Sequence, residues 1–461
     1  MTHKPVVPNQ SKKLKEQLPL FPTLVTRRTR KIVLPAIRLP ETRDQLAQLL
    51  SGDLNFHNAE SHYASHNFHA FAAKFPPQLP RLFIEGLTAP GDVVLDPMMG
   101  SGTTVVEAFL TGRHGVGFDL DPLAVRICRV KVTPLDVDQV REGGVKLLTH
   151  ATRLVDSARV ERELTRRFDE PTRKFIDYWF QPATQREVLA LALSIESVTE
   201  PNLRRFFELC LSSIIVTKSG GVSMARDLAH SRPHLDKTKQ PKNALGQYNQ
   251  RLKKSLRSLE ELGKGTGQVA IQTGDTRRLA LADDSVDLII TSPPYANAID
   301  YMRAHKFSLV WLGDRIDDLS KLRSTYIGAE KITHACYAAL PKGPEGIIRE
   351  LEPKDSNKAA ILRKYFTEMQ EAIHEMYRVA KPGSATVIVI GTSTMRGMDV
   401  QTHLCLADIG QAIGFDVVGV MARQLDRNRR MMPARFGKKS DSMIEQRMHD
   451  EHVIGLVKPY A

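Results

Sequence analysis

The sequence has few cysteines, and their arrangement excludes several kinds of site. Only four occur in 461 residues, and none follows a proline. They show no Cys-x-x-Cys spacing, so we predict no metal site, and four scattered cysteines form no disulfide framework. Three lie in apolar helical patterns, so we interpret them as small buried hydrophobic residues of a protein from a reducing, intracellular compartment. The four are Cys128, Cys210, Cys336 and Cys405.

Long hydrophobic runs are also missing. The longest apolar runs have the length of a strand and no signal peptide is recognisable, so the sequence indicates neither membrane insertion nor export. We therefore expect a cytoplasmic protein, associated with the nucleoid if its partner is DNA. With 42% hydrophobic and 25% charged residues, the chain has the composition of a globular protein with one elaborated domain or two smaller ones.

Positive charge is present in excess, and it favours a nucleic-acid partner. The formal net charge is +13, which attracts phosphate backbones but cannot distinguish DNA from RNA. Residues 1–50 form a basic N-terminal arm with little apolar periodicity. For this arm, a solvated, flexible tail has at least as much support as a segment that grips a nucleic-acid backbone. Its basic residues are Lys12, Lys13, Lys15, Arg27, Arg28, Arg30, Lys31 and Arg38.

The most informative stretch is the motif Thr291-Ser292-Pro293-Pro294-Tyr295. It follows the apolar run 286–290, which is typical of a buried parallel strand. The first proline fixes the backbone, the serine oxygen can accept a hydrogen bond, and the tyrosine ring can lie against a base. The motif could therefore hold a planar ring that carries an amino group. Because Pro-rich turns of similar composition also arise by chance, this interpretation needs support from elsewhere.

Support comes from an upstream glycine loop, Asp-Pro-Met-Met-Gly-Ser-Gly-Thr-Thr, at residues 96–104. Gly100 and Gly102 let the backbone approach a ligand, and the helix that begins behind them favours polar or anionic groups. The loop lacks the lysine of a P-loop and the third glycine of the dinucleotide fingerprint. A second short strand ends at Asp119, where a carboxylate could accept hydrogen bonds from ribose hydroxyls. A solvated acid at a strand end is an equally supported interpretation of Asp119 alone.

Together these residues resemble the S-adenosylmethionine-dependent DNA methyltransferases that methylate exocyclic amino groups, giving N4-methylcytosine or N6-methyladenine. The glycine loop is similar to the cofactor motif of that family, and Thr-Ser-Pro-Pro-Tyr is similar to its catalytic motif. Residues 66–80 resemble the segment that covers the methionine end of the cofactor, and Asp275 stands where the family places an acid near the adenine. Met98 departs from the family, which usually has an aromatic residue there. The resemblance implies S-adenosylmethionine as the cofactor, bound by Phe71, Lys74, Phe75, Asp96, Pro97, Gly100, Ser101, Gly102, Thr103, Asp119 and Asp275.

The same resemblance implies direct methyl transfer to a nitrogen of a flipped base. Ser292 and the Pro293 carbonyl would accept hydrogen bonds from the amino group, so that its lone pair turns toward the methyl sulfonium. Tyr295 would stack on the base. Methylation at carbon 5 of cytosine is disfavoured, since it needs a thiolate that normally comes from a Pro-Cys dipeptide. The catalytic residues are then Ser292, Pro293, Pro294 and Tyr295.

The residue before the two prolines bears on the choice of base. In the family, serine there tends to accompany cytosine N4, whereas aspartate or asparagine accompanies adenine N6. We therefore predict a site-specific DNA methyltransferase that methylates cytosine at N4. Adenine-N6 methylation, methylation of RNA amino groups and non-catalytic binding of nucleic acid are the alternatives.

Alternating strand and helix patterns predict an α/β fold. We expect a doubly wound, seven-stranded class I methyltransferase (Rossmann-like) sheet whose sites lie at the carboxyl ends of its strands. Residues 51–136 would form the cofactor-binding half and residues 263–461 the catalytic half. Residues 137–262 are helical and charged, and we interpret them as an inserted helical subdomain and a candidate for target recognition.

Three segments are candidates for contacting double-stranded DNA. The insert contains a basic stretch, 226–242, for which an exposed linker has equal support. His305 and Lys306 follow the catalytic loop and could reach phosphates near the flipped base, although a helix that packs Leu309, Val310 and Trp311 into the core would explain half of this pattern. A basic loop, 423–447, separates the last two strands, with candidate contacts at Arg427, Arg429 and Arg430. The recognised sequence, the oligomeric state and the existence of a restriction endonuclease partner cannot be read from the sequence.

Overall fold

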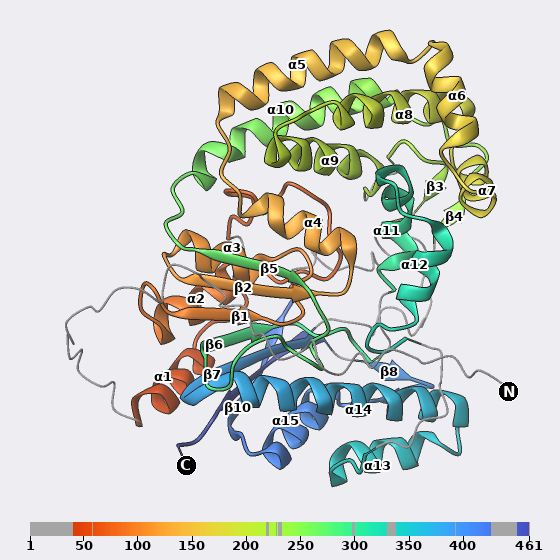
Figure 1. Cartoon of the computed structure of the whole chain (residues 1–461). Helices are drawn as coiled ribbons and strands as arrows, with labels where there is room; N and C mark the ends of the chain where they lie inside the picture. Colours follow the sequence, from red (N-terminus) through yellow and green to blue (C-terminus); the bar gives the residue numbers. More distant parts are fainter. Residues whose placement is uncertain are drawn as a thin grey trace, which may run out of the picture.

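The structure is a computed structural model, and it describes residues 40–57, 59–217, 221–226, 228, 233–296, 300–329, 338–391, 393–425 and 450–460. In this part of the chain a central sheet has helices on both faces, and a bundle of further helices lies beyond one edge of the sheet (Figure 1). None of the described helices is long and apolar enough to cross a membrane.

The central sheet has seven strands in the order β10-β11-β7-β6-β1-β2-β5. The strands β5, β2, β1, β6 and β7 run parallel, and β11 is antiparallel to both of its neighbours. The chain builds outward from β1 through β2 to β5, and then returns to the other side of β1 with β6. The carboxyl ends of β1 and β6 therefore form a topological switch point, where a doubly wound sheet binds its ligands. The strands are β1 (Val93–Asp96), β2 (His114–Asp119), β5 (Val269–Thr273), β6 (Val286–Thr291), β7 (Ala380–Gly391), β10 (Asp416–Gln424) and β11 (Asp450–Val457).

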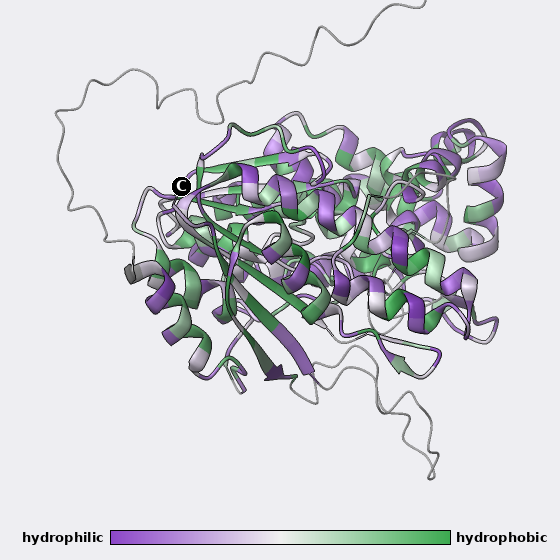
Figure 2. Ribbon diagram, turned by 90° about the horizontal axis from the view of Figure 1, so that it is seen from below, coloured by the Kyte–Doolittle hydropathy of each residue, from purple (hydrophilic) through white to green (hydrophobic). Residues whose placement is uncertain are grey.

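Two layers of helices cover the sheet because its central strands are apolar on both sides. Val94 and Leu288 are buried on one face, beneath α1 (Pro40–Ser51), α2 (Gln78–Leu87) and α3 (Thr103–Leu110). Leu95 and Ile289 are buried on the other face. Such strands are typical of parallel sheets that are covered twice, and Figure 2 shows them largely in the hydrophobic colour. The second face is covered by α14 (Ser356–Val379) and α15 (Thr402–Ile413), and α13 (Lys342–Leu351) packs on these two helices.

The basic arm ends earlier than the sequence predicts. Residues 40–50 belong to α1, whose Leu46 and Leu50 are 0% and 3% exposed against the sheet. Their apolar spacing was obscured by the charged and polar residues just before them, at positions 41–45. Residues 1–39, including all eight basic residues of the arm, lie outside the described residues.

The described part of residues 137–262 is mostly helical. It runs from the first residue of α5 to the last residue of α10, and includes the short hairpin of β3 (Ala225–Arg226) and β4 (His234–Leu235). Its apolar side chains form one core with α4 (Pro122–Lys131) and with α11 (Met302–Leu309), η3 (Val310–Leu312) and α12 (Ile316–Arg323). The insert therefore packs on the segment that follows the catalytic loop. Its helices are α5 (Val137–Leu154), α6 (Ala158–Arg166), α7 (Glu170–Trp179), α8 (Pro182–Glu196), α9 (Pro201–Ile215) and α10 (Ala244–Leu262).

Candidate active site

A cavity of about 610 Å³ lies at the carboxyl edge of the sheet, where the loops after β1, β2, β5 and β6 meet. Most of the predicted site residues line it, although they come from distant parts of the sequence. Gly102, Pro293 and Tyr295 are not among the lining residues. The predicted residues that do line the cavity are Phe71, Lys74, Phe75, Asp96, Pro97, Gly100, Ser101, Thr103, Asp119, Asp275, Ser292 and Pro294.

A buried hydrogen bond joins the glycine loop (residues 96–104), which is the predicted cofactor loop, to the loop of the Thr-Ser-Pro-Pro-Tyr motif (residues 291–295), which is the predicted catalytic loop. Asp96 ends β1 and Thr291 ends the adjacent strand β6, and the Thr291 hydroxyl donates to the Asp96 carboxylate at 2.7 Å. The Met98 amide also donates to this carboxylate, at 3.2 Å. Burial nevertheless raises the pKa of Asp96 to about 6. Thr291 belongs to the motif, but the motif by itself assigned no role to its side chain.

The glycine loop has a backbone that requires glycine at two positions. Gly100 and Gly102 have φ angles of +48° and +75°. A Cβ atom on Gly102 would lie 2.2 Å from the Cys128 sulfur, and one on Gly100 would lie 3.0 Å from the Phe71 ring. Gly102 therefore lets α3 and α4 pack closely behind the cavity, whereas Gly100 lets Phe71 lie over the loop.

Two acids at the end of β2 already accept hydrogen bonds from the backbone. One Asp119 oxygen accepts from the Gly100 amide and the other from the Asp121 amide, each at 2.8 Å. Burial, followed by the charge of Asp121, raises the pKa of Asp119 to about 7. Asp121 caps α4 by accepting from the Leu123 amide at 2.8 Å. Because each carboxylate oxygen has two lone pairs, ribose hydroxyls could still bind Asp119.

The structure corrects the phosphate contact predicted for His305. This residue is 2% exposed, and its Nδ1 atom lies 2.8 Å from an Asp121 oxygen. Burial alone would raise the pKa of Asp121, but the contact with His305 and the backbone donors lower it overall. His305 therefore holds the end of β2 from within the protein. The sequence could not reveal this pair, because it connects α11 to a residue far upstream.

Lys306 and the aromatic residues beside it lie between the site and the insert. The Lys306 ammonium lies 5.2 Å from the centre of the Phe175 ring, and burial lowers its pKa. Nearer the cavity, the rings of Phe71 and Tyr301 stack with centroids 5.1 Å apart. Contact between Lys306 and a phosphate stays a prediction. Arg427, Arg429 and Arg430 lie outside the described residues.

Tyr295 does not have the place expected of a stacking residue. Its side chain is 7% exposed and packs beside Gly391, and its hydroxyl donates to Glu451 at 3.1 Å. Glu451 forms an ion pair with Arg423, whose Nε atom donates to the Leu54 carbonyl at 2.9 Å. The ring lies behind the catalytic loop because this buried polar chain anchors it there. The prediction that Tyr295 stacks on a base is therefore wrong in this arrangement.

Asp275 lines the cavity but is also engaged by a neighbouring arginine. Arg277 contacts its carboxylate at 2.7 Å and contacts Glu368 of α14 at 3.0 Å. Burial would raise the pKa of Asp275, but the Arg277 hydrogen bonds lower it overall.

One wall of the cavity was not predicted from the sequence. It comes partly from the segment after the catalytic loop, which the sequence marked only as a candidate DNA contact. The rest comes from the end of α12 and the residues that follow, where no short motif marks a ligand site. The additional lining residues from this wall are Asp300, Tyr301, Arg303, Ser320, Arg323, Ser324, Tyr326, Ile327, Gly328 and Ala329.

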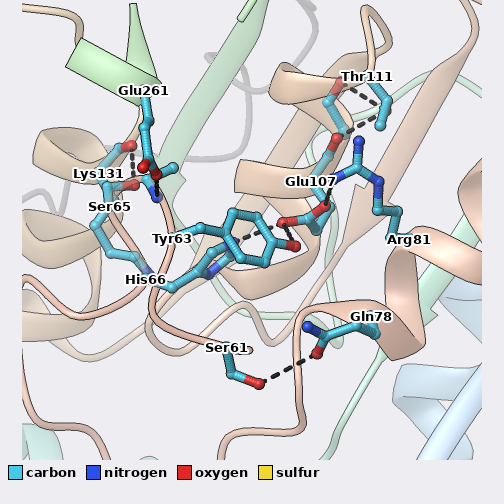
Figure 3. A network of polar contacts seen from close by, with 12 residues as sticks. Ser61, Tyr63, Ser65, His66, Gln78, Arg81, Glu107, Thr111, Lys131 and Glu261 are labelled. Atoms are coloured by element: carbon cyan, nitrogen blue, oxygen red, sulfur yellow. Dashed lines mark hydrogen bonds and ion pairs between the residues drawn. The ribbon is translucent and has the colours of Figure 1, made fainter. Parts of the chain in front are cut away.

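A second polar network supports the glycine loop from behind (Figure 3). Glu107 of α3 is fully buried, and its carboxylate accepts a hydrogen bond from the Tyr63 hydroxyl at 2.8 Å. The Nε2 atom of His66 lies 2.6 Å from the same carboxylate oxygen. Lys131 of α4 donates to the Ser101 carbonyl at 2.7 Å. Burial raises the pKa of Glu107 to about 7 and lowers that of Lys131 to about 7. The network therefore ties the segment before Phe71 to α3 and fixes a carbonyl of the cofactor loop.

Comparison with known proteins agrees with this arrangement. A family model described as DNA methylase matches residues 41–129 and 286–449, which leaves the insert between the two matched parts. The chain is 23% identical to the type II methyltransferase M.MvaI of Kocuria varians, over 77% of this chain and 83% of that protein. It is 21% identical to the type II methyltransferase M.BsoBI of Geobacillus stearothermophilus, over 83% of this chain and 85% of that protein.

Among solved structures, the chain is similar to a DNA modification methylase of Thermus thermophilus, TTHA0409, which was solved with S-adenosyl-L-methionine. The sequence identity is 17%, the match covers 41% of this chain and 54% of that one, and the TM-score is 0.21. With so low a score, this likeness carries no argument about the site.

Proposed function

The chain belongs to the DNA methylase family of S-adenosylmethionine-dependent enzymes that methylate amino groups, and from this premise we propose that it methylates cytosine at N4 in double-stranded DNA. The supporting observation is the place of Ser292. It is the residue before the two prolines, and it lines the same cavity as the glycine loop. A hydroxyl there can accept a hydrogen bond from an exocyclic amino group.

The residues of the cavity fit the cofactor. The loop at Gly100 allows close approach of a ligand, and the acids at the end of β2 can accept from ribose hydroxyls. Ser101 lines the cavity, and its hydroxyl is buried without a hydrogen-bond partner in the described part of the chain. S-adenosylmethionine supplies a methyl group bound to a positively charged sulfur.

The chain itself would contribute orientation. In the proposed reaction, the two N–H groups of the base donate hydrogen bonds to the Ser292 hydroxyl and to the Pro293 carbonyl. These two hydrogen bonds direct the lone pair of the amino nitrogen into the cavity. Thr291 is bonded to Asp96, and the Tyr365 hydroxyl donates to the Pro294 carbonyl at 2.9 Å. The acceptors therefore stand on a loop that is fixed on both sides, which lowers the cost of aligning the base.

Mass spectrometry of nucleosides tests this proposal. The purified protein is incubated with labelled S-adenosylmethionine and either duplex DNA or structured RNA, with Ser292→Ala as a control of much lower activity. We expect labelled N4-methylcytosine from DNA alone. N6-methyladenine would overturn the choice of base, label only in RNA would overturn the choice of substrate, and cofactor binding without any transfer would indicate a binding protein.

We also propose that the insert, residues 137–262, reads the target sequence. Support comes from its shared core with α11, which follows the catalytic loop directly. Because similar proteins are type II methyltransferases, a restriction endonuclease of the same specificity is included as a proposed partner. Single-molecule sequencing of DNA from cells that express the chain would give the modified base and its sequence context. Exchange of the insert for that of a relative should change this context, and an unchanged context would assign recognition to another segment.

A further inference from the structure

Two arginines on the cavity wall beside α11 and α12 meet at one carboxylate. The Nε atoms of Arg303 and Arg323 lie 2.8 Å and 2.5 Å from the same oxygen of Asp300. All three residues line the cavity. Arg303 belongs to α11 and Arg323 is the last residue of α12, so this carboxylate joins two helices as well as two guanidinium groups.

The contacts with Asp300 leave the outer ends of both guanidinium groups available. Each arginine meets the carboxylate through Nε, and the terminal nitrogens make no hydrogen bond within the described residues. The side chains of Arg303 and Arg323 are 26% and 45% exposed, so this wall is partly open to solvent. The terminal nitrogens of a guanidinium group form a planar fork that binds a phosphate through two oxygens.

Positive charge exceeds negative charge at this wall. Asp300 carries one negative charge, whereas Arg303, Arg323 and the nearby Lys306 carry three positive charges. Burial and the charge of Arg323 lower the pKa of Lys306. The other acids that line the cavity follow β1, β2 and β5, where the cofactor is expected. The wall beside α11 and α12 therefore favours an anion.

This wall stands between the catalytic loop and the insert. Asp300 follows that loop closely in sequence, and α12 contacts α7 of the insert (Figure 1). The Ile316 amide at the start of α12 donates to the Thr172 hydroxyl of α7 at 3.1 Å. A base that turns out of a duplex to reach Ser292 stays joined to the phosphates on its two sides. Those phosphates remain outside the cavity, on the side where the insert would hold the duplex.

We propose that Arg303 and Arg323, aligned by Asp300, bind a phosphate beside the flipped nucleotide. This inference rests on the proposed function, because the phosphate arrives with a base of duplex DNA. It assigns the phosphate contact expected after the catalytic loop to two partly exposed arginines instead of the buried His305. Asp300 is then a positioning residue, since it holds both guanidinium groups in place before DNA binds.

The salt dependence of DNA binding tests the charge of this contact. Fluorescence anisotropy with S-adenosylhomocysteine present measures the affinity of the full chain for a duplex that carries the methylated sequence context. Each phosphate contact contributes about 0.9 to the slope of log Kd against log salt concentration. Arg303→Gln and Arg323→Gln should each weaken binding about 10-fold and lower this slope by about 1. Arg323→Lys keeps the charge and should retain the slope.

Duplexes with one neutral phosphate analogue locate the contact. A methylphosphonate replaces the phosphate on one side of the target base in one duplex and on the other side in a second duplex. One of the two should bind the wild type about 10-fold more weakly than unmodified DNA. The same replacement should change the affinity of Arg323→Gln by less than about 2-fold, because its contact is already lost. Equal losses in wild type and variant would overturn the proposal.

Arg315→Gln is the matched control. Arg315 directly precedes α12, is 71% exposed and does not line the cavity. Its substitution should leave the slope unchanged, and an effect equal to that of Arg323→Gln would refute the assignment.

Calorimetry with S-adenosylhomocysteine in the absence of DNA separates phosphate binding from cofactor binding. The affinity should be the same in wild type, Arg303→Gln and Arg323→Gln. A fall in this affinity with DNA binding retained would place the arginines at the cofactor carboxylate and overturn the proposal. If the wild type bound no duplex DNA, the proposed function would fail as well. Wild-type DNA binding with unchanged binding by both variants would overturn the phosphate contact alone.

Discussion

Ser292 stands between residues that are tied to two strands of the sheet and to one helix that covers it. Thr291 is bonded to Asp96 of β1, the Pro294 carbonyl to Tyr365 of α14, and Tyr295 to Glu451 of β11. The backbone at Ser292 is therefore fixed by its neighbours, and its hydroxyl is left to face the cavity. Substitution of the serine should then alter chemistry with little effect on the fold.

We expect Ser292→Ala to lower the rate of methyl transfer by about 100-fold, as loss of a preorganised polar group typically does. The affinity for S-adenosylhomocysteine, measured by calorimetry, should stay within about 2-fold of the wild-type value, which is near the precision of that measurement. Single-turnover kinetics with duplex DNA and calorimetry measure the two quantities. Ser285→Ala, at an exposed hydrogen bond just before β6, is the control. A parallel fall in cofactor affinity would place Ser292 in the cofactor site instead.

Asp119 provides a prediction about pH. Its pKa is raised to about 7 in the folded protein, so the folded state binds a proton that the unfolded state releases near pH 4. Its contribution to stability is therefore fully present below about pH 4 and is lost as the pH rises toward about 7. Asp119→Asn removes this titration. The difference in unfolding free energy, wild type minus variant, should fall between about pH 4 and about pH 7 in urea titrations, and a flat difference would contradict the pKa assignment.

Single residues show where prediction from sequence reached its limit. The glycine loop and Ser292 could be identified because local motifs define them. The roles of His305 and Tyr295 could not, since each depends on one partner, Asp121 or Glu451, that only the fold brings near. Histidine often contacts phosphates and tyrosine often stacks on bases, but both side chains are buried in this fold.

At the scale of elements, the strands and the insert were predictable because strong apolar patterns mark them. Seven strands form the expected sheet, and α5 to α10 begin and end at the predicted bounds of the insert. Helix α1 was missed, since its buried leucines stand among polar residues. The cavity wall around Tyr326 was missed because nothing local distinguishes it from an ordinary helix end.

The packing of α3 on α4 should depend strongly on Gly102. Gly102→Ala places a Cβ atom 2.2 Å from the Cys128 sulfur at a φ of +75°. The backbone conformation alone costs about 1–2 kcal/mol, and the overlap adds about 1–3 kcal/mol. Gly397→Ala is a matched control, because its φ is +77° and a Cβ atom would meet no described residue within 4 Å. In urea denaturation, the free energy of unfolding should fall more for Gly102→Ala than for Gly397→Ala. An equal fall in the two variants would mean that α4 shifts to accommodate the Cβ atom at no energetic cost.

At the scale of the whole molecule, the insert also supports the cofactor cavity. Arg251 of α10 donates to the carbonyls of Asn67 and Phe68, and the His69 ring contacts the Ser212 hydroxyl of α9 at 2.8 Å. These residues immediately precede Phe71, which lines the cavity. Segments that a linear division would assign to target recognition therefore hold part of the cofactor site.

Arg251→Met should consequently weaken both folding and cofactor binding. Loss of hydrogen bonds from a charged donor to two partly buried carbonyls should lower the unfolding free energy by about 2–3 kcal/mol. The affinity for S-adenosylhomocysteine should fall as well, because the segment before Phe71 loses its anchor. Lys254→Met, on the exposed side of the same helix, is the control and should change neither. If Arg251→Met destabilised the protein without changing this affinity, the insert and the cavity would be energetically independent.

The position of β11 means that the central sheet is completed by the last of its strands to be synthesised. This strand lies between β7 and β10, although it follows both in the chain. While a ribosome is still translating the region before residue 450, β10 has no neighbour in the sheet and Tyr295 has no Glu451. A nascent chain can thus possess every motif of the glycine and catalytic loops and still lack the last support of the catalytic loop. Pairing of this strand with β7 and β10 therefore completes the central sheet and brings Glu451 to Tyr295.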